Sequence, residues 1–232
     1  MEKAKQNAAS EKEMQTVSEK EMQTISEKEI QTVSEKETQT VSEKEIQAEL
    51  PEKIKQTILL EKTGIFSKSL SRRYEYTITC KGVDTKKILV ICTNPASSNL
   101  LAVDTTTNYL MNNLFAMGYS TITLCNLFAE ITNKLKPAKA EDNADNMEYL
   151  KEILKRDFDE ILLGFGNGFT GNKRVKAEKE TLYKILKPYA KKLVELVDTD
   201  GTYKNLKTIH PLFAGQRFSG KWMIRKFNFP KL

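Results

Sequence analysis

Segments with the pattern of β-strands alternate with helix-favouring segments from residue 73 onward, and this alternation constrains the fold most. Residues 73–80 alternate at period two, as a half-buried strand does, whereas residues 87–92 form the continuous apolar run of a strand covered on both faces. Further strands are expected at 121–125, 161–163 and 193–197, with a short one before His210. Helices are expected after Asp104 as N-cap up to residue 117, and over 141–156 and 172–187. The pattern predicts an α/β fold, a three-layer sandwich with a mostly parallel central sheet.

Residues 1–50 are a different kind of sequence, built on an eight-residue repeat. Copies of S-E-K-E-x-Q-T-V or a close variant begin at Ser10, Ser18, Ser26, Ser34 and Ser42. Eight residues advance an α-helix by about 80° beyond two full turns, so the apolar positions drift around the helix and form no coiled-coil seam. We therefore expect a low-complexity tail over 1–50, disordered or transiently helical, and one folded domain over 51–232.

The repeats also suggest partners for the tail. Residues 36–40 read K-E-T-Q-T and resemble the K-x-T-Q-T peptide that dynein light chains recognise, although this copy alone has Thr at the variable position. Repeated copies also suit multivalent self-association. Repeat expansion of a neutral linker is the plainer interpretation.

Composition disfavours membrane insertion, secretion and zinc binding. No stretch approaches the ~18–20 apolar residues that span a bilayer, and the N-terminus lacks the apolar region of a secretory signal. The three cysteines lie in apolar or β-branched runs, which indicates reduced, buried thiols and an intracellular, cytoplasmic location. With His210 as the single histidine and no C-x-x-C pair, we expect no metal ion and no cofactor.

Charge is distributed unevenly between the two parts. The first 50 residues hold 12 Glu and 7 Lys, a net of −5, and the chain totals +6, so the folded part carries +11. A domain this basic is a candidate for binding a polyanion such as DNA. The candidate DNA-contacting cations are Lys173, Arg174, Arg217, Lys221 and Arg225, the last three interleaved with aromatic residues. A solvated Lys-rich helix face, or a C-terminal helix packed on the core, would give the same pattern.

Four short segments follow expected strands, at the ends where α/β sheets bind ligands. They are Asn94-Pro95-Ala96-Ser97, Asn126-Leu127-Phe128-Ala129, Phe165-Gly166-Asn167-Gly168 and His210-Pro211-Leu212. Over roughly residues 72–226, their order and spacing resemble an uncharacterised bacterial and phage domain family with the pattern N-P-S, N-L-F-A, W-G and H-P-L. That pattern in turn resembles the uracil-DNA glycosylase superfamily, whose motifs are G-x-[DN]-P, an asparagine, L-L-W-G and H-P-S-P. The resemblance implies a uracil-DNA-glycosylase-like fold.

The resemblance also implies roles for individual residues. Asn94 would position the attacking water, and His210 would donate a hydrogen bond to the departing base. Asp104 is the fallback general base, although a helix N-cap is the stronger interpretation of this residue from sequence. Asn126 would read the edge of the flipped base, because one amide offers both a donor and an acceptor.

The remaining candidates are less closely aligned with the superfamily. Tyr109 and Phe128 are candidates to stack the base, Ser97 to contact the phosphate, and Leu212 or Phe213 to fill the gap that the flipped base leaves. Phe165 stands where the superfamily has tryptophan, and Leu212-Phe213 follow His210-Pro211 in place of Ser-Pro. These departures leave the identity of the base open.

The function implied is that of a monofunctional DNA N-glycosylase, which excises a modified or mismatched pyrimidine and leaves an abasic site. Phage-associated relatives add a role in phage–host conflict as an expectation. A nucleotide-binding protein is an alternative, because Gly166, Gly168 and Gly171 spell G-x-G-x-x-G between a strand and a helix and Asp198 is spaced to hold a ribose. A basic nucleic-acid-binding module without catalysis is a third interpretation.

Overall fold

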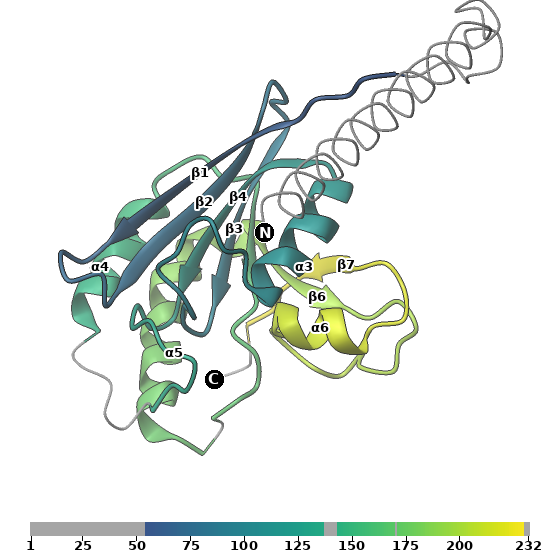
Figure 1. Cartoon of the computed structure of the whole chain (residues 1–232). Coiled ribbons are helices and arrows are strands. Elements are labelled where there is room, and N and C mark those ends of the chain that lie inside the picture. Colours follow the sequence, from purple (N-terminus) through teal and green to yellow (C-terminus); the bar gives the residue numbers. More distant parts are fainter. Residues whose placement is uncertain (1–53, 137–142, 170, 230–232) are drawn as a thin grey trace, which may run out of the picture. The chain divides into compact units, whose positions relative to one another are not determined.

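The structure, a computed structural model, describes residues 54–136, 143–169 and 171–229, so the octapeptide repeats and the expected boundary at residue 50 lie outside the described residues. Seven strands form one mixed sheet in the order β1-β2-β4-β3-β5-β6-β7 (Figure 1). They are β1 Leu59–Phe66, β2 Arg73–Lys81, β3 Lys86–Cys92, β4 Tyr119–Asn126, β5 Glu160–Leu163, β6 Leu193–Val197 and β7 Met223–Lys226. Strands β4, β3, β5 and β6 are parallel to one another, whereas β1, β2 and β7 pair antiparallel. The expectation of a mostly parallel sheet therefore holds for the centre and not for the edges.

The strands that differ from expectation lie at or near the edges of the sheet. The apolar residues of β1 stand in pairs at its two ends and do not alternate with polar ones, and β7 has four residues, two of them basic, so the sequence indicated neither strand. The short strand expected before His210 is absent. Strand β7 occupies the edge of β6, pairing Val194 with Lys226, and the Thr208 N–H donates to the Glu195 carboxylate at 2.9 Å instead of to a neighbouring strand.

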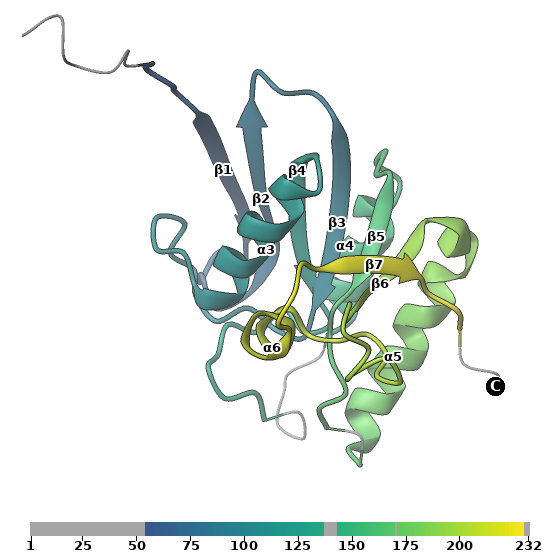
Figure 2. The same cartoon turned by 90° about the vertical axis from the view of Figure 1, so that its right-hand side faces the viewer.

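Helices cover both faces of the sheet (Figure 2). The helices are α3 Thr105–Ala116, α4 Ala144–Ile153, α5 Lys173–Leu186 and α6 Pro211–Arg217, with a 3-10 helix at Lys187–Lys192. Helices α4 and α5 pack into the core on one face, and α3 and α6 into the core on the other. Asp104 caps α3 as expected, accepting from the Thr107 N–H at 2.8 Å. No helix in the described part of the chain is long and apolar enough to cross a membrane.

The order of the central strands fixes where a ligand site can form. From β3 the chain crosses to β4 on one side, while β5 lies on the other side of β3. In open α/β sheets ligands bind at such a switch point, outside the carboxyl ends of the strands. The segments that leave β3 and β5 meet there, because the Thr93 hydroxyl donates to the Phe165 carbonyl at 2.9 Å.

Candidate functional site

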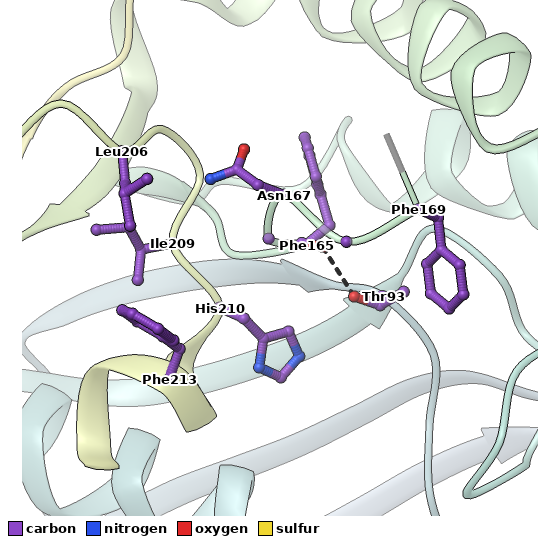
Figure 3. A pocket seen from close by; sticks show the side chains of 10 residues that line it. Thr93, Phe165, Asn167, Phe169, Leu206, Ile209, His210 and Phe213 are labelled. Atoms are coloured by element: carbon purple, nitrogen blue, oxygen red, sulfur yellow. Dashed lines mark hydrogen bonds between the residues drawn. The ribbon is translucent and has the colours of Figure 1, made fainter. Parts of the chain in front are cut away.

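Two pockets lie at this carboxyl edge of the sheet. The first, the small pocket, has a volume of about 40 Å³. Its ionisable and amide side chains are Arg73, Asn94, Asp104, Asn126 and His210. The second, the large pocket, has a volume of about 360 Å³ and is shown in Figure 3. His210 lines both pockets, so they adjoin at its side chain.

The small pocket brings together four residues that the sequence singled out separately. Asn94 follows β3, Asp104 precedes α3, Asn126 ends β4 and His210 precedes α6. They are spread over more than a hundred positions of the chain. Asn94 and Asn126 meet because the parallel strands β3 and β4 end at one edge, and the loops before α3 and α6 bring Asp104 and His210 to the same edge.

The side chain of Asn94 is held from one end. Its Nδ2 donates to the Thr132 carbonyl at 2.7 Å and to the Pro95 carbonyl at 3.2 Å. Because these bonds use both amide hydrogens, Oδ1 is the atom that can accept a hydrogen bond from a water or a ligand.

A buried cation faces the same pocket as Asp104. Arg73 is 5% exposed, and its Nη1 donates to the Ser97 carbonyl at 3.2 Å. Desolvation lowers the pKa of Arg73, and the Asp104 carboxylate opposes that shift. Sequence analysis missed Arg73, because one arginine at the start of a strand carries no signal of its own.

Two buried polar atoms on the lining of the small pocket have no hydrogen-bond partner among the described residues. They are Asn126 Oδ1, on a side chain that is 2% exposed, and Arg73 Nε. A buried polar atom left without a partner costs about 1–3 kcal/mol, so such atoms are normally met by water or a ligand. A cavity of about 10–15 Å³ already admits one water, so the small pocket has room for ordered water held by several polar groups.

His210 is a neutral hydrogen-bond donor in this structure. As N-cap of α6, its Nδ1 accepts from the Leu212 N–H at 3.2 Å, so the ring hydrogen is on Nε2. Desolvation lowers the pKa of His210 from 6.5 to about 4, with the Asp104 carboxylate opposing the shift. The imidazole is therefore uncharged at neutral pH and can donate from Nε2.

Gly166 allows the close approach that His210 requires. Gly166 has φ +70°, and a Cβ on it would lie 3.2 Å from the Cβ of His210. Its N–H donates to the Thr208 carbonyl at 2.7 Å, which ties the segment after β5 to the segment that carries His210.

Acid is expected to destabilise the wild-type chain more than His210→Asn. Between pH 6.5 and 4 the unfolded chain binds a proton at His210 that the folded chain does not, so the free energy of unfolding falls as the pH drops through this window. The loss reaches about 3 kcal/mol, at about 1.4 kcal/mol per pKa unit. This loss is absent from His210→Asn, because asparagine does not titrate, and asparagine still suits the N-cap position. Urea unfolding of both proteins, followed by Trp222 fluorescence at several pH values, measures the difference between their free energies of unfolding. The carboxylates titrate in both proteins, so their effect cancels in this difference. If the free energies of unfolding of the two proteins change in parallel with pH, the pKa of His210 is not lowered in the folded chain.

The other residues proposed from sequence lie away from the small pocket. Phe128 is 1% exposed in the core that contains α4 and α5. Tyr109 packs 6.5 Å from Trp222, ring to ring, and closely against Gly215. The Ser97 hydroxyl accepts from the Asn99 N–H.

The two wedge candidates start helix α6. Leu212 donates its N–H to His210. Phe213 lines the large pocket, with its ring 5.1 Å from that of Tyr203.

The predicted DNA-contacting cations fall into two groups. Lys173 and Arg174 begin α5, directly after the loop of the large pocket, Arg217 ends α6 and Lys221 is exposed. Arg225 is instead engaged inside the fold, where its Nε donates to the Glu195 carboxylate at 2.9 Å.

Glu195 is a second residue that sequence analysis missed. It is fully buried on β6, and besides Arg225 it pairs with Lys207 Nζ at 3.1 Å and accepts from the Thr208 N–H at 2.9 Å. These bonds hold the segment that leads to His210. A glutamate within an apolar strand is the signal that could have indicated it.

The glycine loop shows no feature specific to a phosphate site. A Cβ on Gly168 or Gly171 would meet no atom within 4 Å, so neither position requires glycine for packing. The Asp198 carboxylate accepts from the backbone N–H groups of Asp200 and Tyr203 and so stabilises its own turn. Across residues 54–136, 143–169 and 171–229, no group of three metal-ligating side chains is close enough to hold an ion.

Comparison with known proteins identifies a family. No curated protein matches the chain, and no solved structure does. A family model described as "Protein of unknown function (DUF1643)" matches residues 73–212, a span that contains Arg73, Asn94, Asp104, Asn126 and His210. Since this match covers more than half of the sequence, the chain belongs to the DUF1643 family.

Proposed function

We propose that this protein hydrolyses the N-glycosidic bond of a modified or mismatched pyrimidine in DNA and leaves an abasic site. The observation that carries the proposal is the meeting of Asn94, Asp104, Asn126 and His210 around one small pocket that has room for water. A relation to the uracil-DNA glycosylase fold is part of the proposal, supported by the helices on both faces of the sheet.

The small pocket supplies the attacking water. Asn94 Oδ1 accepts one hydrogen of the water and orients its oxygen towards C1′ of the sugar. Asp104 accepts the proton as the bond between the water oxygen and C1′ forms. Its carboxylate also accepts from the Thr107 N–H and hydroxyl, at 2.8 and 3.1 Å, which fixes its orientation.

His210 acts on the leaving group. As the bond between C1′ and the base nitrogen breaks, the electron pair leaves with the base, which becomes anionic. The neutral Nε2–H of His210 donates to a carbonyl oxygen of that base and stabilises the developing charge. A neutral donor suits this role because it keeps its proton at every pH above about 4.

Substitutions at Lys221 and Arg225 are expected to separate DNA binding from stability. Lys221→Ala removes an exposed cation, so it lowers the slope of log affinity against log salt by about one and leaves stability unchanged. Arg225→Ala removes one partner of the fully buried Glu195 and lowers the free energy of unfolding by about 2–3 kcal/mol. That is less than the ~3–5 kcal/mol typical of a broken buried pair, because Lys207 remains. Fluorescence anisotropy with duplex DNA at several salt concentrations, together with urea unfolding, measures both. Equal effects of the two variants would contradict the assignment.

Base release is the direct test of the proposed function. The full chain is incubated with end-labelled DNA that carries uracil, a thymine mismatch or a 5-modified pyrimidine, and abasic sites are then cleaved by heating in alkali. We expect strand breaks at one of these bases with the wild type and a loss of breaks with His210→Ala. If no base is released from any of these DNAs, the proposal is wrong.

A further inference from the structure

The large pocket differs in chemistry from the small pocket beside it. Its volume of about 360 Å³ is at the lower end of the ~300–1,000 Å³ range of small-molecule sites. Three phenylalanines from separate segments line it: Phe165 after β5, Phe169 in the glycine loop and Phe213 in α6. Figure 3 shows Phe169, Phe213 and the imidazole of His210 at this pocket, whereas the ring of Phe165 is 3% exposed and packs against Tyr183 and Lys179. Aromatic faces arranged in this way suit a planar ring, which gains by stacking.

Phe169 is an unusual residue on this lining. It has φ +60°, a backbone conformation that non-glycine residues seldom adopt, and its side chain is 44% exposed. The exposed part of the Phe169 ring buries no surface in the fold, so it does not offset the strain of this backbone conformation. Such outliers are concentrated at ligand sites, where a bound molecule covers the side chain.

The small pocket has a volume of about 40 Å³, far below that of the large pocket, and several polar side chains line it. Asn126 lies on that pocket, at the end of β4, and does not line the large one. His210 reaches both, and its Nε2–H is the donor that a ring carbonyl in the large pocket would accept. The structure thus places a small polar pocket beside a larger apolar one.

We propose that the large pocket binds the base and that it selects a pyrimidine with an apolar substituent at its 5-position over uracil. This proposal rests on the proposed function and changes the residues that determine specificity, from Asn126 to Phe165, Phe169 and Phe213. Leu206 and Ile209 add to a lining whose surface is mostly apolar, and Thr93, Asn167 and His210 are its polar side chains. Ring area and apolar substituents therefore decide affinity more than polar exocyclic groups do.

Direct binding of free bases tests the pocket without requiring catalysis. Uracil, thymine and 5-ethyluracil are titrated into the full wild-type chain and followed by calorimetry and saturation-transfer NMR. We expect affinity to rise in that order, by about fourfold for each carbon added, since a buried methylene contributes about 0.8 kcal/mol. Uracil binding as tightly as 5-ethyluracil would overturn the preference for the substituent.

Two pairs of variants locate the binding site. Phe169→Ala is expected to weaken thymine binding by about 5- to 150-fold, the range for the loss of one stacked ring. Leu70→Ala is its control, since Leu70 has φ +57°, is 58% exposed and does not line the pocket. Gly168→Leu is expected to block the pocket, whereas Gly171→Leu, in the same loop but off the lining, leaves binding unchanged.

The outcomes distinguish this proposal from the function on which it rests. If Phe169→Ala and Gly168→Leu lose thymine binding but no DNA releases a base, base binding in the large pocket is supported and the glycosylase function is wrong. If the wild type releases a base and Phe169→Ala and Gly168→Leu release it equally well, the glycosylase function is supported and base binding in the large pocket is wrong. Equal loss of thymine binding in each variant and its control also overturns the pocket.

Discussion

Replacing His210 by alanine is expected to slow single-turnover base release by about 100- to 1,000-fold, the effect of one donor to a developing anion. The dissociation constant for DNA should stay nearly unchanged, because the imidazole stabilises charge that exists in the transition state and not in the bound ground state. The reason for both expectations is geometric: Nδ1 is bonded to the Leu212 N–H, and only Nε2 is available to the substrate.

Two further variants make this prediction specific. His210→Gln keeps a neutral N–H donor of similar reach and should recover part of the rate. His210→Asn can cap α6 but is too short to reach the leaving base, so it should be as slow as alanine. The wild-type rate should show no inflection near pH 6.5, because the pKa of His210 is lowered to about 4. If His210→Ala releases the base at the wild-type rate, His210 does not stabilise the leaving base.

The parts of the site that sequence could predict are those fixed by the ends of strands. Asn94 and Asn126 each come at or just after an apolar strand, and parallel strands end at the same edge, so their meeting follows from topology. From sequence, Phe128 is a candidate to stack the base because an aromatic residue is expected after the first motif, and its place in the sequence does not determine where its ring points. Beyond the end of β4 the alternation of faces no longer applies, and Phe128 turns into the core beneath α4 and α5.

Long-range contacts account for what sequence could not provide. Arg73 and Glu195 each stand at a position that the strand pattern assigns to an ordinary lining or core residue, and their role depends on partners far along the chain. The basic residues near the C-terminus illustrate the same limit. Lys221 and Arg225 look alike in sequence, yet Arg225 is paired with a buried carboxylate and Lys221 is exposed. The pairing becomes apparent only when β7 is placed beside β6.

Asp104→Asn is expected to have the second large effect, a loss of about 100- to 10,000-fold in the rate of base release, the range for a general base. Asparagine is as good an N-cap as aspartate, so α3 and the free energy of unfolding should be nearly unchanged. The substitution therefore removes the proton acceptor and retains the cap, which separates the two interpretations that the sequence left open.

Comparison with Asn94 then decides which residue handles the water. Asn94→Ala removes the oxygen that orients the water, and its smaller loss of rate should be accompanied by some loss of stability, because the bonds to Thr132 and Pro95 are also lost. Thr107→Val serves as the control for Asp104→Asn, since it removes the hydroxyl contact to the carboxylate at 3.1 Å and leaves the carboxylate itself in place. If Asp104→Asn releases base at the wild-type rate while Asn94→Ala does not, Asp104 is a helix cap and the water is activated by position alone. If Asp104→Asn alone is slow, the carboxylate is the base, and the small pocket that it lines with His210 is the place where the bond to C1′ forms.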